Sequence, residues 1–98
     1  MSKRFGRFDP ADYIKDAEDA RAYLEAAIEE AGDDPAFIAD ALGVIARSGN
    51  MSELARQTGM SREGLYKALS ANGNPSFATI MSVARALGLR LRFEPVPA

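Results

Sequence analysis

Several polar side chains fall on one side of a short predicted helix near the middle of the chain. At about 100° per residue, residues 62–70 divide into an apolar half and a polar half. The polar half carries a guanidinium, a carboxylate, a phenol, an ammonium and a hydroxyl group, on Arg62, Glu63, Tyr66, Lys67 and Ser70. Such groups can read base edges in the DNA major groove and hold phosphates. The pattern favours DNA binding, although a polar face on a short helix is usually only a solvated face.

Two of these side chains have specific expected roles. Arg62 can fork onto a guanine, and Glu63 can accept a hydrogen bond from cytosine N4. Glu63 also stands in the first helical turn, where a carboxylate can simply favour the helix dipole or orient Arg62. Both interpretations of Glu63 stay open.

Two short helices joined by a tight turn are predicted to position this face. The first covers residues 53–58 with Ser52 as its N-cap, and the second covers residues 62–70 with Ser61 as its N-cap. Between them, Gly59 can adopt the positive φ that ends a helix and turns the chain sharply. This spacing is typical of a helix-turn-helix, whose second helix enters the major groove.

Phosphate contacts are expected from hydroxyl and amide groups near helix N-termini and in the loop after the second helix. The candidates are Ser52, Ser61, Asn72 and Asn74. For the two serines, plain helix capping explains their presence equally well.

Composition argues against an enzyme. At 98 residues the chain is one small domain with a modest core. It has no Cys and no His, which excludes zinc sites built from those residues and Ser-His or Cys-His nucleophile pairs. The acids fall mostly on the outer faces of predicted helices. We expect no catalytic residue, no bound metal and no cofactor.

The chain contains no stretch that approaches the ~20 apolar residues of a membrane span. Its first ten residues lack the apolar core of a secretory signal. We therefore expect a cytoplasmic protein with no membrane partner.

The net charge of −2 hides an asymmetry along the chain. Residues 1–48 carry 11 acids and 6 bases, a balance of −5, whereas residues 49–98 carry 3 acids and 6 bases, a balance of +3. A basic half can bind phosphate, and an acidic half is freer to bind a basic partner.

Three further helices are predicted from apolar stripes and caps. They cover residues 17–31 after Asp16, residues 35–48 after Asp34, and residues 77–87 after Ser76. Their inward positions include Ile28, Phe37, Phe77 and Met81. Tyr13 and Ile14 are expected in the core or in a short strand.

The tail has the pattern of a β-strand. Residues 89–93 alternate apolar and basic side chains. A lone strand leaves its ladder groups unsatisfied, so this one must pair with the N-terminal segment or with the same strand of a second copy.

The second half of the chain resembles the lambda-repressor-like (Cro/C1-type) helix-turn-helix proteins. More closely, the span from Phe8 to Glu94 resembles the HigA-like addiction-module antidote proteins. The matching strings are FDPADYI, followed by an acidic helix, and then SREGLYKALS, GNPSFATI and ALGLRL. The chain departs from many antitoxins in that no long disordered tail is visible.

The resemblance implies an all-α fold, a five-helix lambda-repressor-like domain with an N-terminal helix extension and a short C-terminal β-strand. It also implies an antitoxin that neutralises a small basic RelE/ParE-type toxin. As a homodimer, such a protein represses its own operon by binding double-stranded DNA at a palindromic operator.

The expected organisation has three parts. Residues 1–15 form an N-terminal arm that includes Phe5 and Phe8, residues 16–48 form acidic helices that are candidates for toxin binding, and residues 49–94 form the DNA-binding region with the C-terminal strand. Two alternatives remain, a stand-alone helix-turn-helix transcriptional regulator without a toxin partner, and an interaction module that no longer binds DNA.

Overall fold

A computed structural model of the protein describes residues 9–97. Within that range the chain is all-α, as predicted, with five α-helices, one short 3-10 helix and no strand. In chain order the elements are η1 (Pro10–Tyr13), α1 (Ala17–Ala31), α2 (Pro35–Arg47), α3 (Met51–Thr58), α4 (Arg62–Ala68) and α5 (Phe77–Ala86). Most of the predicted arm, with Phe5 and Phe8, lies outside the described residues.

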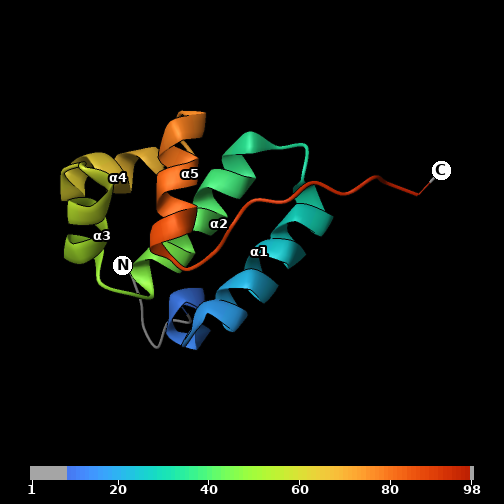
Figure 1. The fold of residues 1–98 in the computed structure, drawn as a ribbon, viewed down its shortest axis with the longest axis horizontal. Helices are drawn as coiled ribbons and strands as arrows, with labels where there is room; N and C mark the ends of the chain where they lie inside the picture. Colours follow the sequence, from blue (N-terminus) through green and yellow to red (C-terminus); the bar gives the residue numbers. More distant parts are fainter. Residues whose placement is uncertain (1–8, 98) are drawn as a thin grey trace.

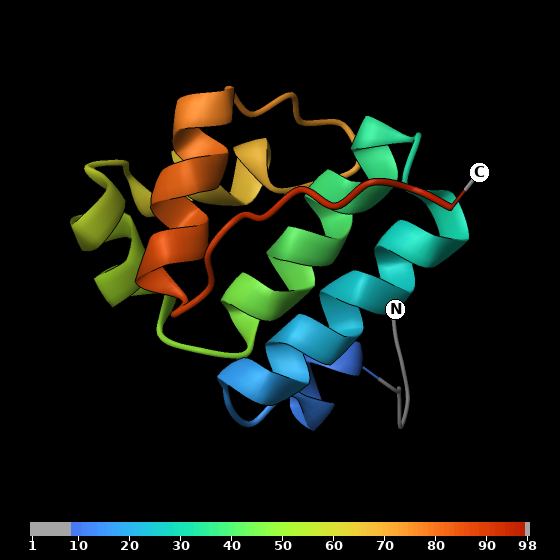
Figure 2. The ribbon, with the colours of Figure 1, turned by 45° about the vertical axis from the view of Figure 1, so that its right-hand side comes forward.

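Helix α2 runs through the middle of the molecule, between α1 and α5 (Figure 1, Figure 2). Every residue from Ala41 to Ala46 is buried, because other elements surround the helix on several sides. Its many small side chains let those neighbours approach closely. Helix α1 packs along α2, and α3 packs against α5, α4 and α2.

Local capping explains most helix starts. The side chains of Asp16, Asp34, Ser61 and Ser76 accept hydrogen bonds from backbone N–H groups of the first turns of α1, α2, α4 and α5, as predicted. At α1, Asp19 also accepts a hydrogen bond from the Lys15 backbone N–H, one residue before the N-cap, at 3.0 Å.

The predicted N-cap of α3 is wrong. Asn50, not Ser52, caps this helix, with its Oδ1 accepting from the Glu53 N–H at 3.0 Å. Asn is as good an N-cap as Ser, and its earlier position lets the helix begin at Met51. Ser52 therefore lies inside the first turn of α3, exposed to solvent.

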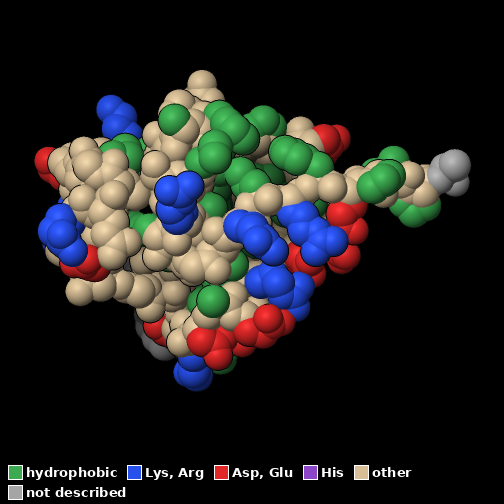
Figure 3. Space-filling model, in the orientation of Figure 1, with side chains coloured by type: hydrophobic (Ala, Val, Ile, Leu, Met, Phe, Trp, Pro, Cys, Tyr) green, Lys and Arg blue, Asp and Glu red, His purple; other side chains and the backbone are tan. Residues whose placement is uncertain are grey.

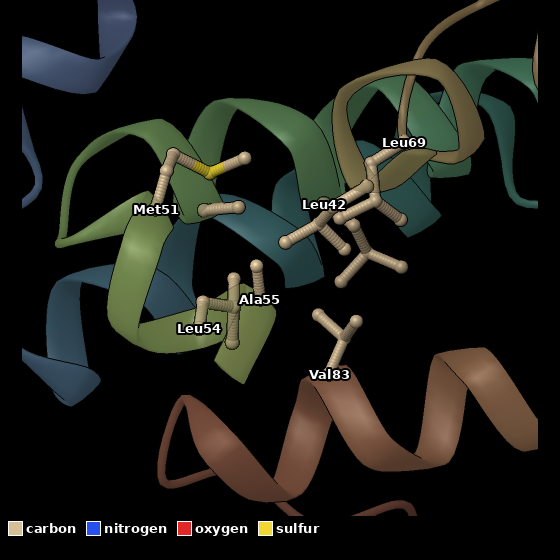
Figure 4. Close-up of a cluster of buried hydrophobic side chains, with 8 residues drawn as sticks. Leu42, Met51, Leu54, Ala55, Leu69 and Val83 are labelled. Carbon is tan, nitrogen blue, oxygen red and sulfur yellow. The ribbon is translucent and has the colours of Figure 1, made fainter. Parts of the chain in front are cut away.

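The main core lies where α2, α3, α4 and α5 meet. Figure 4 shows Val83 of α5 pointing toward Leu42 of α2 and Leu69 at the end of α4, with Leu54 and Ala55 of α3 beside them. A second cluster joins η1, α1 and α2, and consists of Ala11, Ile14, Ala20, Val44 and Ile45.

Some apolar residues predicted to face inward are exposed. Ile28, Phe37, Phe77 and Met81 all lie at the surface, with 61% of Phe77 exposed. In α5 the inward stripe is centred on the fully buried Val83, which turns Phe77 and Met81 to the side of the helix. Tyr13 is likewise 65% exposed in η1, whereas Ile14 is buried as expected.

The predicted C-terminal strand does not form in the described residues. The chain after α5 runs across α2 and onward to the C-terminal end of α1 without pairing (Figure 1, Figure 2). Leu89 anchors its start, because its backbone N–H donates to the Ala84 carbonyl at 2.8 Å and its side chain packs on the second cluster. An alternating pattern makes a strand only when another strand supplies the ladder.

Among residues 9–97, no helix is long and apolar enough to cross a membrane.

Candidate nucleic-acid interface

Three residues, Gly59 to Ser61, connect α3 to α4. Gly59 has the predicted positive φ, 74°, a backbone conformation that Gly adopts at little cost. The Met60 N–H then donates back to the Ala55 carbonyl at 3.0 Å, which closes the end of α3 as in a Schellman motif. Ser61 starts α4 at once, its Oγ accepting from the Gly64 N–H at 2.9 Å. The relative position of the two helices is therefore set by local hydrogen bonds.

Burial of one side of α4 fixes which side chains it presents to solvent. Leu65 is fully buried and Leu69 is 4% exposed, because both pack into the main core. The rest of the helix surface carries Arg62, Glu63, Tyr66 and Lys67, all of which are exposed. At about 100° per residue, Lys67 and Glu63 lie most nearly opposite the two leucines, and Arg62 borders Leu69. The structure thus brings four of the predicted site residues together on one solvent-facing surface.

Arg62 is held beside an aromatic ring rather than beside an acid. Its guanidinium carbon lies 5.9 Å from the centroid of the Tyr66 ring, within the range of a cation–π interaction. No ion pair within residues 9–97 joins Arg62 to Glu63. Among the described residues, Arg62 therefore contacts Tyr66, and Glu63 forms no ion pair.

The remaining predicted site residues lie on α3 or just before and after α4. Ser70, just after α4, is half-buried and donates through its Oγ to the Lys67 carbonyl at 2.9 Å. Asn72 and Asn74 are exposed in the loop between α4 and α5. Ser52 is on the separate helix α3, and the Ser61 hydroxyl serves as a cap.

The region from α3 to α5 has an excess of positive charge. Residues 50–86 contain four bases and two acids. Arg56 pairs with Glu53, and hydrogen bonds from Arg56 and then from the Gln57 amide lower the pKa of the Glu53 carboxyl. Within the described residues, Arg62, Lys67 and Arg85 form no ion pair. Three cations of this region are thus available to phosphates.

Sequence reasoning missed Gly43 of α2, which allows the end of α4 to pack against the central helix. An interior Gly in a helical pattern often has such a packing reason. The interior position of Gly43 can be seen in the sequence, but the sequence does not indicate which element packs against it.

A second surface lies on the opposite, acidic half of the chain. Residues 16–40 contain nine acids and one base, Arg21. Between α1 and α2 is a groove of about 150 Å³ lined by Tyr23, Ala26, Ala27, Glu30, Phe37, Asp40 and Ala41. Arg21 is already engaged by Glu18 and Glu25, and no described Lys or Arg pairs with Glu30 or Asp40.

Comparison with known proteins identifies the family. A model of a family described as "Probable addiction module antidote protein" matches residues 4–95, nearly the whole chain. The chain belongs to this antidote family. Membership implies a toxin as a partner, of a type that the family description does not specify.

One relative is a protein of Haemophilus influenzae (strain ATCC 51907 / DSM 11121 / KW20 / Rd), itself described as an uncharacterized protein. It is 46% identical over 94 residues, which span 96% of this chain and 95% of the relative. No solved structure matches the chain.

Proposed function

We propose that the protein is the antitoxin of a type II toxin–antitoxin module. It neutralises a small basic RelE/ParE-type toxin and, as a homodimer, represses its own operon at a palindromic operator. Membership of the antidote family supports the first role. The exposed polar face of α4, backed by Leu65 and Leu69, supports the second and is the observation that carries the DNA-binding proposal.

In this proposal α3 and α4 act as a helix-turn-helix, and α4 lies in the major groove. Arg62 forks onto a guanine, Glu63 accepts from a cytosine, and Lys67 holds a phosphate. Further contacts to the DNA phosphates come from Ser52, Ser61, Asn72 and Asn74. A dimer would place two α4 helices in successive major grooves, about one helical turn apart.

The toxin docks on the groove between α1 and α2. Its walls are largely apolar, with Phe37 partly exposed, and Glu30 and Asp40 stand at its edge. A basic segment with an apolar anchor fits this chemistry, since the anchor would bury Tyr23 and Phe37 while a Lys or Arg reaches the carboxylates.

The charges of α1 support a binding role for this surface. Glu29 and Glu30 lie in the last turn of α1, which contains no base. Acids there oppose the helix dipole and cost about a few tenths of a kcal/mol each. A cationic partner on the same surface would turn that cost into an attraction.

The protein acts in this proposal by binding alone, in the cytoplasm, without a cofactor or a catalytic residue. Co-expression tests it. A tagged copy would be expressed with the neighbouring reading frame, and the neighbour would also be induced alone. The proposal expects a small basic protein to co-elute and to stop growth unless this chain is present. If no partner co-elutes and the neighbour is harmless, a stand-alone DNA-binding regulator is the better account.

A further inference from the structure

The C-terminal segment exposes both apolar side chains and backbone hydrogen-bonding groups. Among residues 89–97, only Leu89 takes part in a backbone hydrogen bond. Leu91 is 44% exposed and Phe93 is 87% exposed. Figure 3 shows Lys and Arg side chains along the path of this segment as it leaves α5. An extended segment with unpaired N–H and C=O groups is a ready template for another strand.

Local residues limit the length of that template. Gly88 has a φ of 80°, so the extended stretch begins after it. Pro95 has no N–H to donate and disfavours continuation. The usable stretch is residues 89–94, in which Leu89, Leu91 and Phe93 alternate with charged side chains.

Only two antiparallel registers between copies of this stretch keep its faces aligned and pair five of its residues. In an antiparallel pair, residues directly opposite each other point to the same face. An apolar side chain must therefore lie opposite an apolar one, which requires the two-fold axis to pass through a residue. Five residues of the 89–94 stretch then pair only when that residue is Leu91 or Arg92. A shift by one residue would place charges opposite apolar side chains.

Electrostatics distinguishes the two registers. With the axis at Leu91, Arg90 lies opposite Arg92 of the partner subunit, and this repulsive pair occurs twice. With the axis at Arg92, Arg90 lies opposite Glu94 of the partner subunit, and this attractive pair occurs twice. Leu91 then faces Phe93 of the partner subunit, and only one like-charge pair remains, at the axis itself.

We propose that residues 90–94 pair with the same residues of a second copy, antiparallel and with the two-fold axis at Arg92. The charge pattern is self-complementary in this register, which argues for a second copy rather than another protein. The site is continuous with α5, because a hollow of about 230 Å³ is lined by Met81, Ala84, Arg85, Leu89, Arg90 and Leu91. The pairing deepens, and rests on, the homodimer of the proposed function.

Charge reversal on the full chain tests this register without DNA or toxin. The dimer dissociation constant would be measured by sedimentation equilibrium for the wild type, R90E, E94R and R90E/E94R. Each single reversal changes two attractive pairs into repulsive ones, so we expect each to weaken the dimer about tenfold. The double reversal restores both pairs and should return the constant to near the wild-type value.

R92E separates the two registers further. With the axis at Arg92, R92E replaces one like-charge pair by another and leaves the dimer nearly unchanged. With the axis at Leu91, R92E would create two attractive pairs and tighten the dimer, which would overturn the proposed register. Because residues 90, 92 and 94 are exposed, we expect each variant to retain the fold. Circular dichroism melting of each variant checks this.

A wild-type chain that stays monomeric at high concentration would overturn the pairing altogether. If that monomer still neutralised a co-expressed toxin, the antitoxin function would stand and only the strand pairing would fail. If single reversals left the dimer unchanged, the dimer would form through another surface.

Discussion

Gly43 of α2 lies directly beneath the carbonyl group of Leu69, the C-cap of α4. A methyl group placed on Gly43 would come within 2.1 Å of the Leu69 carbonyl oxygen, far inside van der Waals contact. The central helix therefore has a residue without a side chain at the point where the end of α4 approaches it. Because Arg62, Tyr66 and Lys67 project from α4, the contact between Gly43 and Leu69 also sets the positions of these side chains.

We predict that G43A destabilises the protein and shifts α4. The added methyl must displace backbone, so we expect a loss of about 1–3 kcal/mol in the free energy of unfolding. G49A is the matched control, since the nearest atom to its new methyl would be 4.0 Å away. Urea unfolding of both variants tests this, and equal stability of G43A and the wild type would contradict the close approach.

The two serines predicted as N-caps should respond differently to substitution. S61A removes the acceptor for the Gly64 N–H, and we expect a loss of about 1 kcal/mol in the free energy of unfolding. S52A should leave stability nearly unchanged, because Asn50 caps α3. Thermal melts measure both effects. A large destabilisation by S52A would show that the cap of α3 has been assigned to the wrong residue.

Ser52 also offers a clean test of phosphate contact. Because S52A is expected to retain the fold, a fall in its DNA affinity would indicate a lost phosphate contact. Unchanged affinity would remove Ser52 from the interface.

Lys67 should bind a phosphate rather than a base. K67A is expected to weaken binding to all DNA sequences alike and to reduce the slope of log affinity against log salt by about 1. K15A, at an exposed Lys that precedes α1, is the control and should leave the slope unchanged. Fluorescence anisotropy over a range of salt concentrations measures this slope for each variant. A K67A slope equal to that of the wild type would contradict the assignment.

Stability should fall in acid partly through Asp9. A hydrogen bond from the Ala11 N–H lowers the pKa of the Asp9 carboxyl below its ordinary value of 3.8. Burial opposes part of this shift, and the hydrogen bond and charge of Arg47 lower the pKa further. A carboxyl with a lowered pKa in the folded state stabilises the protein above its unfolded-state pKa, and this contribution is lost as pH falls through the folded-state pKa.

D9N should therefore flatten the fall of the melting temperature below about pH 4. The amide oxygen can still cap η1, so D9N removes the titration and retains the cap. Part of the acid sensitivity should persist, because the pKa values of Glu18 and Glu53 are lowered in the same direction by their Arg partners. An unchanged pH profile for D9N would show that Asp9 does not contribute.

Sequence predicted the local features of this fold well and the long-range ones poorly. The bounds of α1 and the start of α2 followed from Asp16, Asp34 and Pro35, because caps act within a few residues. At α3 two good caps stood two residues apart, and sequence gave no way to choose Asn50 over Ser52. The polar face of α4 followed from the period of a single helix.

The errors arose where another element decides the outcome. Residues 89–93 have a strand pattern, but a strand requires a partner that one chain does not provide. The inward stripe of α5 is centred on Val83 rather than Met81 because α3 and α4 pack on that side. The role of Gly43 depends on a contact with Leu69, 26 positions further along the chain.

In the proposed function one protein uses two separate surfaces, α4 for DNA and the groove between α1 and α2 for a toxin. A growth-rescue assay examines whether the two surfaces act separately. The neighbouring toxin would be induced from a foreign promoter together with the wild type, D40R, D12R or K67A. Asp12 is an exposed acid outside the groove, so D12R controls for charge reversal itself.

We expect D40R to lose rescue, whereas D12R and K67A rescue growth as the wild type does. Rescue by D40R equal to that of the wild type, or loss of rescue by K67A with its fold intact, would contradict the separation of the two surfaces.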